Sequence, residues 1–358
     1  MRTTRRIAAA AVAATVLVPA AAAHGATRTV IAGPPAKVAN VPKDGDTNAF
    51  YRKQVTVHVG DKVRWRFNGF HTVTIPAKGD DPPAFIGQDP TGNKITGVND
   101  AAGNPFWFNG QARIALQDEG ALPQGGSKYN GNRLASSGAP LQAGPPRPYT
   151  LRFTRKGTFS YYCTIHTGMK GTVKVVSRGK RIPTNRANTR AAKKEYARVV
   201  KRLKKDTKFP GRLGNAVEAG HDTLTTTFFR FFPATKSVPV GTSVTFLMSP
   251  KTTEAHTISF GPADYLQQQA DAFITPDPIN PQLPPVVSPV AAFPSEPPPQ
   301  APLDPAQHGN GFFNTGVLDR DSATPLNPPE ARVTFNKAGT YNYICLIHPN
   351  MKGSIVVG

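Results

Sequence analysis

Sulfur-containing residues are scarce in this chain of 358 residues, which has two cysteines and four methionines. Two cysteines cannot build the disulfide framework of a small secreted scaffold. Acidic residues are also few, because 22 Asp and Glu face 43 Lys and Arg and leave a formal net charge of +21. Beyond the N-terminal segment no apolar run is long enough to cross a bilayer, so we expect no transmembrane segment in the mature chain.

The N-terminal segment, residues 1–23, has the pattern of an export signal. Arg2, Arg5 and Arg6 precede an uncharged, Ala-rich stretch that ends in small residues. A retained membrane anchor fits less well, because the stretch is short and Ala-rich for a spanning helix. We therefore predict an exported protein that is periplasmic, associated with the cell envelope, or secreted.

Glycine and proline are plentiful, with 32 and 36 residues, and 39% of the chain is hydrophobic. This composition indicates loop-rich β structure around real apolar cores rather than disorder. Segments such as Lys62 to Phe67 and Thr172 to Val176 alternate apolar and polar residues with a period of two. The alternation predicts strands with one buried face, and thus an all-β sandwich.

Two passages of the sequence repeat without a gap. Phe153 to Val175 matches Phe335 to Val357 at 11 of 23 positions. Upstream of them, Val57 to Phe67 matches Val238 to Met248, and each is followed by a Thr-rich run with one histidine. The chain therefore contains two copies of one unit.

The repeat sets the expected domain boundaries at residues 27–177 and 221–358, with a linker at 178–220 between them. Residues 178–212 carry a net charge of +12. A short amphipathic, basic helix is expected from about residue 189 to 206 because apolar residues fall there at helical spacing. These residues are Ala192, Tyr196, Val199, Val200 and Leu203.

Each copy carries a long insertion between its upstream histidine and its cysteine. In the second copy, Pro276 to Pro305 contains 12 prolines in 30 residues, which predicts an extended surface loop. Both insertions also contain aromatic residues, Phe106-Trp107-Phe108 and Phe312-Phe313. We expect these rings to pack the insertions onto the sandwich rather than to form a surface for a partner.

Both cysteines lie in the pattern Cys-x-x-His-x-x-Met, and each copy has one more histidine upstream. A thiolate and two imidazoles in a plane, with a weak thioether, suit copper that cycles between Cu(I) and Cu(II). Structural zinc takes four strong Cys or His ligands, and a buried cysteine beside an unrelated methionine does not explain two matched sets. We predict two coppers per chain, with the ligands His71, Cys163, His166 and Met169, and His256, Cys345, His348 and Met351.

The two ligand loops, Tyr-Cys163-Thr-Ile-His166-Thr-Gly-Met169-Lys-Gly and Ile-Cys345-Leu-Ile-His348-Pro-Asn-Met351-Lys-Gly, resemble those of cupredoxins of the plastocyanin, pseudoazurin and amicyanin type. The resemblance implies two Greek-key β-sandwich domains joined by the basic, partly helical linker. It also implies blue copper electron transfer, with the loop histidines His166 and His348 near the surface as electron exits. The insertions are a departure from the family, and they could cover those exits. Thr72 and Thr257 depart from the family pattern, in which asparagine often follows the upstream histidine.

Two other functions are alternatives to that of an electron carrier. A copper oxidoreductase of the nitrite reductase or laccase kind needs an additional copper site, but no His-x-His occurs, and Tyr162 and Ile344 precede the cysteines where those enzymes have a relay histidine. The remaining histidines, which we expect to be surface or core residues, are His24, His58, His221 and His308. A copper-binding or trafficking protein is the second alternative, although such proteins favour exposed, exchangeable sites.

The preferred function is thus single-electron transfer between redox partners. The basic linker could dock an acidic redox protein or an anionic envelope surface, or it could be a solvated spacer. Nucleic acid is not an expected partner of an exported copper protein.

Overall fold

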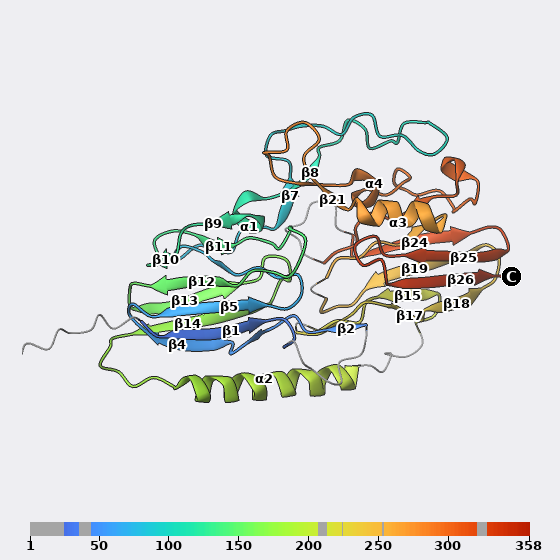
Figure 1. Cartoon of the computed structure of the whole chain (residues 1–358). Coiled ribbons are helices and arrows are strands. Elements are labelled where there is room, and N and C mark those ends of the chain that lie inside the picture. The colour runs from blue at the N-terminus through green and yellow to red at the C-terminus, as the bar shows by residue number, and fades with distance from the viewer. Residues whose placement is uncertain (1–24, 36–43, 207–212, 224, 253, 321–327) are drawn as a thin grey trace, which may run out of the picture.

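The computed structural model describes residues 25–35, 44–206, 213–223, 225–252, 254–320 and 328–358 (Figure 1). Strands dominate its regular structure, as the sequence predicts. The proposed export signal, residues 1–23, lies outside the described residues. In the described ranges no helix is both long and apolar enough to cross a membrane.

The N-terminal half is a sandwich of two sheets with the strand orders β10-β12-β5-β1-β3 and β4-β14-β13-β6-β11-β9. The alternation of apolar and polar residues explains why these segments form a sandwich. In strand β5, Val63, Trp65 and Phe67 face the core, and the alternate residues face outward. The strands are β1 (Thr27–Ala32), β3 (Phe50–Tyr51), β4 (Gln54–His58), β5 (Lys62–Phe67), β6 (Thr74–Ile75), β9 (Pro123–Gln124), β10 (Lys128–Tyr129), β11 (Ala135–Ser137), β12 (Tyr149–Phe153), β13 (Gly157–Tyr162) and β14 (Lys170–Val176). A short helix, α1 (Asp118–Ala121), precedes β9.

The C-terminal half is a second sandwich, with its own core and the sheet orders β17-β15-β19-β24 and β18-β26-β25-β20-β23. Strand β15 runs parallel to β19 as β1 does to β5, and β18 runs parallel to β26 as β4 does to β14. The repeated sequence thus folds into the same strand arrangement twice. The strands are β15 (Ala216–Ala219), β17 (Phe231–Phe232), β18 (Thr235–Val238), β19 (Thr242–Met248), β20 (Ser259–Phe260), β23 (Phe313–Asn314), β24 (Glu330–Phe335), β25 (Gly339–Ile344) and β26 (Lys352–Val357).

The two insertions pair with each other above the sandwiches (Figure 1). They share a sheet with the order β21-β22-β8-β7, in which Val286 of one insertion lies opposite Ala115 of the other. Its strands are β7 (Ile86–Gln88), β8 (Ile114–Leu116), β21 (Ile274–Thr275) and β22 (Val286–Val287), and the second insertion adds helices α3 (Ala263–Asp271), α4 (Pro289–Ala292) and η1 (Gln307–Gly309).

The prediction of an extended surface loop at residues 276–305 is therefore wrong for the middle of this segment, which contains β22 and α4. Val286, Val287 and Phe293 are buried, and α4 starts with Pro289 in its first turn. Proline is tolerated there because the first N–H groups of a helix have no partner within the helix.

The aromatic residues of the insertions form a core between the insertions. The rings of Phe106 and Phe108 stack with centroids 4.9 Å apart, and Phe312 lies edge-on to Phe106 at 6.3 Å. Trp107 donates a hydrogen bond of 2.9 Å from Nε1 to the carbonyl oxygen of Pro294. The rings thus hold one insertion against the other, and not simply each insertion onto its own sandwich.

The linker helix α2 (Asn185–Asp206) begins four residues before the predicted start and lies along the opposite edge of the molecule (Figure 1). Glu195 accepts hydrogen bonds from the backbone N–H groups of Arg52 and Lys53 at 2.7 and 2.9 Å. At its C-terminal end Leu203 packs with Phe228 of the second half. A further link is the strand pair of β2 (Gly45–Asp46) and β16 (Thr227–Phe228), so the two halves are joined at several places.

A buried ion pair also connects the insertions. Arg113 donates from Nε to Asp89 at 2.9 Å and contacts Asp277 of the other insertion through a second nitrogen. All three side chains are buried. Loss of the guanidinium would leave two carboxylates buried without their counter-charge.

We therefore expect Arg113→Met to lower the free energy of unfolding by on the order of 3 kcal/mol in urea titrations. The matched control is Lys337→Met, which breaks the exposed pair between Lys337 and Asp304, 2.9 Å apart. The control should leave the unfolding midpoint where it is, because exposed pairs stabilise little. Equal midpoints for both variants would contradict the role given to Arg113.

Candidate metal centres

The first candidate centre forms where a tight loop meets a neighbouring strand. Cys163 and Met169 flank the loop between β13 and β14, and the loop is closed by backbone hydrogen bonds of 3.0 Å from Cys163 to Met169 and from Met169 to His166. His71 comes from the segment before β6. The Cys163 Sγ lies 3.4 Å from Nδ1 of His166, which lies 3.0 Å from Nδ1 of His71.

The second centre repeats this arrangement. The Cys345 Sγ lies 3.7 Å from Nδ1 of His256 and 3.7 Å from Nδ1 of His348. The two Nδ1 atoms are 3.3 Å apart. In both centres, the thiol and the same nitrogen of two imidazoles converge on one point.

These distances are close to those of a trigonal copper site. Donors that each lie about 2.0–2.3 Å from one ion in a plane are about 3.5–4 Å from each other. The donor atoms here are 3.0–3.7 Å apart, so they lie within or slightly below that range. Met169 and Met351 are buried in the same apolar cores as Cys163 and Cys345, where a thioether donor would have to be. The structure therefore brings the predicted Cys and His residues together, while the thioether contact and the metal itself stay predictions.

The threonines that follow the upstream histidines hold the ligand loops. The backbone N–H of Thr72 donates to the Cys163 Sγ at 3.4 Å, and that of Thr257 donates to the Cys345 Sγ at 3.4 Å. The Thr72 hydroxyl accepts from the backbone N–H of Thr164 at 2.8 Å, and the Thr257 hydroxyl from that of Leu346 at 2.7 Å. Threonine thus ties the strand of the upstream histidine to the cysteine loop.

Two glycines that the sequence reasoning missed lie against the upstream histidines. Gly33 and Gly220 follow β1 and β15 with φ angles of +80° and +70°. A Cβ at either position would lie 2.6 Å from Nε2 of His71 or His256, closer than side chains approach. The sequence signal was an Ala-Gly pair at the end of the first strand of each copy.

The two thiols differ in their electrostatics. Burial raises the pKa of both. At Cys163 the positive charge and hydrogen bond of His166, with those of His71, overcome burial and bring the pKa well below its usual value. At Cys345 the hydrogen bonds from Thr257 and from backbone groups of the loop offset burial only in part, so the pKa of Cys345 is raised.

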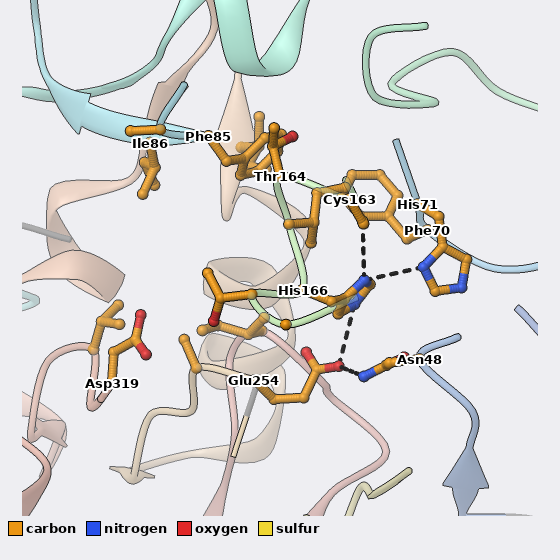
Figure 2. A pocket seen from close by; sticks show the side chains of 18 of the residues that line it. Asn48, Phe70, His71, Phe85, Ile86, Cys163, Thr164, His166, Glu254 and Asp319 are labelled. Atoms are coloured by element: carbon orange, nitrogen blue, oxygen red, sulfur yellow. Dashed lines mark hydrogen bonds and ion pairs between the residues drawn. The ribbon is translucent and has the colours of Figure 1, made fainter. Parts of the chain in front are cut away.

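Glu254 joins the two centres. Its Oε1 lies 3.1 Å from Nε2 of His166 (Figure 2). Its Oε2 lies 3.8 Å from Nε2 of His348. Asn48 donates a hydrogen bond of 2.6 Å to Oε1. Burial raises the pKa of Glu254, but the charges of His166, His348 and His256 outweigh burial and lower it to about 2. Sequence reasoning did not find Glu254, because its partners come from three distant segments.

The loop histidines are turned toward the junction of the two halves. The resemblance implied that they lie near the surface, but the side chain of His166 is only 8% exposed and that of His348 only 20%. The ring of Phe229 also lies against His348, with centroids 4.5 Å apart. The expected surface exit at His166 is therefore wrong, because the second half of the chain covers it.

A cavity of about 760 Å³ lies beside Glu254 and is lined by His166 and His348. Figure 2 shows Phe85 and Ile86 of the first insertion on one side of this space, with Glu254 and Asn48 on the other. Both candidate centres thus border one cavity.

The other histidines pair with different groups. His58 contacts Asp61 and the carbonyl oxygen of Lys180, and His221 lies 3.3 Å from Glu218. His308 lies 3.1 Å from Asp100 and 2.9 Å from Glu296. Across the described parts of the chain, the clusters of three potential metal-binding groups are those at Cys163 and Cys345. His24 lies outside the described residues.

No protein-family model and no curated protein matches the sequence. Solved structures of cupredoxins do match. A purple cupredoxin from Nitrosopumilus maritimus is 15% identical, with 40% of this chain and 98% of that chain covered and a TM-score of 0.21. An oxidised plastocyanin from Dryopteris crassirhizoma is 20% identical, with 40% of this chain and 99% of that chain covered and a TM-score of 0.21. An amicyanin variant is 18% identical, with 40% of this chain and 80% of that chain covered and a TM-score of 0.20.

Asp222 is a buried acid at the edge of the second centre. It accepts hydrogen bonds from the hydroxyls of Thr227 and Thr252 and, at 3.2 Å, from the backbone N–H of Phe228. Burial, with the nearby charge of Glu254, raises the pKa of Asp222 from 3.8 to about 7.

This raised pKa predicts a pH-dependent stability. Between pH 4 and 7 the folded chain keeps a proton that the unfolded chain has lost, so stability falls as the pH rises. We expect the unmodified chain to lose about 2–3 kcal/mol more than Asp222→Asn between pH 5 and pH 8, as measured by urea unfolding at each pH. Parallel stability curves for the two proteins would rule this out.

Proposed function

We propose that the chain is a blue copper protein with two sites of the Cys-His-His-Met type, which transfers single electrons. The observation that carries the proposal is the convergence of one thiol and two Nδ1 atoms in each half. The ligand sets are His71, Cys163, His166 and Met169, and His256, Cys345, His348 and Met351. Copper bound to such a set supplies a one-electron Cu(I)/Cu(II) couple.

The chain's own residues hold these donors in place before a metal binds. The loop hydrogen bonds fix each cysteine relative to its methionine and histidine, and the threonine amides point at the sulfur atoms. Fixed donors suit electron transfer, because the coordination changes little between the two oxidation states. Buried, closely packed donors also favour a retained metal over one that is passed on, so the structure supports a carrier rather than a trafficking protein.

We also propose that the protein works outside the cytoplasm, based on the export pattern of residues 1–23. The exposed face of α2 supports docking of an anionic redox partner or an anionic envelope surface by electrostatic attraction. Its exposed cationic residues are Arg186, Arg190, Lys193, Lys194, Arg198, Lys201, Arg202, Lys204 and Lys205.

Metal analysis tests the ligand sets directly. We expect two coppers per mature chain and one copper in each of Cys163→Ser and Cys345→Ser, because a hydroxyl is a far weaker copper ligand than a thiolate. The intense visible absorption of the thiolate–copper unit should fall by roughly half in each variant.

Met248→Leu is the control for this experiment, because Met248 is buried in the second core outside the ligand pattern and should leave two coppers. Two coppers in either cysteine variant, or fewer than two in the unmodified chain, would refute the proposed ligand sets.

A further inference from the structure

The cavity between the halves has the size and wall of a small-molecule site. Its volume of about 760 Å³ falls within the usual range for ligand pockets, about 300–1,000 Å³. Phe70, which lines it, is 41% exposed, and Pro82 and Thr167 of the lining are exposed too. The cavity therefore opens to solvent, unlike the buried donor atoms of the two centres.

The walls of the cavity favour a flat, uncharged ligand that can donate hydrogen bonds. Aromatic and branched side chains line it from both halves of the chain, and they include Phe70, Phe85, Ile86, Phe229, Phe273 and Val287. Three acidic side chains, those of Asp46, Glu254 and Asp319, also line it, and they outnumber the lysine of the lining, Lys170. Carboxylates accept hydrogen bonds from hydroxyl groups, and they repel anionic ligands.

The cavity lies between the two candidate metal centres. The imidazoles of His166 and His348 both line it, and their Nε2 atoms lie 3.1 and 3.8 Å from one carboxylate, that of Glu254. Both imidazoles face the junction of the two halves, and the side chains of His166 and His348 are only 8% and 20% exposed, so little of either is open to a protein partner. A small molecule in the cavity can contact both.

We propose that this cavity binds a small aromatic diol of the benzene-1,4-diol class, which is the electron donor of the protein. The inference rests on the proposed function. Oxidation of one diol to the 1,4-quinone breaks two O–H bonds and releases two electrons and two protons. The diol gives one electron to each of the two Cu(II) centres, and both protons pass to water at the cavity mouth. Two one-electron acceptors around one cavity match a two-electron donor.

Binding is tested first on the metal-free full-length chain, by calorimetry or NMR titration with benzene-1,4-diol and with benzene-1,3-diol, which cannot form a quinone. Both should bind. Ile86→Trp and Ala84→Trp fill the cavity from the first insertion, away from the metal ligands. We expect each to weaken binding at least tenfold. Ile279→Trp is the matched control, because Ile279 is 65% exposed and does not line the cavity.

Reduction of the copper-loaded chain by benzene-1,4-diol is measured next, by stopped flow. We expect a rate that saturates with diol concentration, competition by benzene-1,3-diol, and reduction of both coppers by one equivalent of diol. In the Ile86→Trp variant the reduction rate should no longer saturate with diol concentration, and the variant should still bind two coppers. If it does not fold, Ala84→Trp gives the same comparison.

The outcomes separate this inference from the proposed function. No diol binding to a folded chain, or equal binding by Ile86→Trp and Ile279→Trp, would overturn the diol site even if both coppers load and cycle. Failure to load copper would overturn the proposed function, whatever the cavity binds.

Discussion

The buried carboxylate of Glu254 is the constraint on which the arrangement of the two halves depends. An ionised carboxylate is costly to bury unless opposite charges and hydrogen bonds surround it. Here those partners come from both halves: His166 and Asn48 belong to the first, and His348 belongs to the second along with Glu254 itself. The charge is therefore compensated only when the sandwiches meet with their ligand loops facing each other. With the carboxylate in this place, the two candidate metal centres are neighbours around one cavity.

The remaining contacts between the halves can be understood as supports for this junction. The paired strands β8 and β22 close it on the insertion side, the paired strands β2 and β16 lie close to Asn48, and α2 spans the opposite edge. The two insertions meet across the junction through the pair of β8 and β22. Their aromatic core and the ion pair at Arg113 make this connection rigid. A loose linker between two carriers would need none of these contacts.

The sequence predicted what depends on local spacing. Cys-x-x-His-x-x-Met and the repeat predicted the cysteines and histidines that converge in each half, while the methionines remain predicted ligands. The period-two and helical patterns predicted the strands and most of α2. The junction could not be predicted in this way, because Glu254, Asn48 and His166 are far apart in the sequence and share no periodicity. The proline-rich segment misled for a related reason: a few buried residues between prolines form β22 and α4 only because the other insertion supplies the surface they cover.

The same candidate ligands occur in both halves, but the two candidate centres have different surroundings. Glu254 lies closer to His166 than to His348, at 3.1 against 3.8 Å, and the His348 side chain is the more exposed of the two. Against the effect of burial, the charge of Glu254 helps to raise the pKa of His166, whose positive charge in turn lowers the pKa of the Cys163 thiol. At the second centre burial outweighs the charge of Glu254 and lowers the pKa of His348, and the pKa of the Cys345 thiol is raised. The junction therefore contributes to the asymmetry, because one carboxylate lies closer to one of the two facing histidines. Duplication therefore supplied two equal sets of donors, and the packing of the halves made their surroundings unequal.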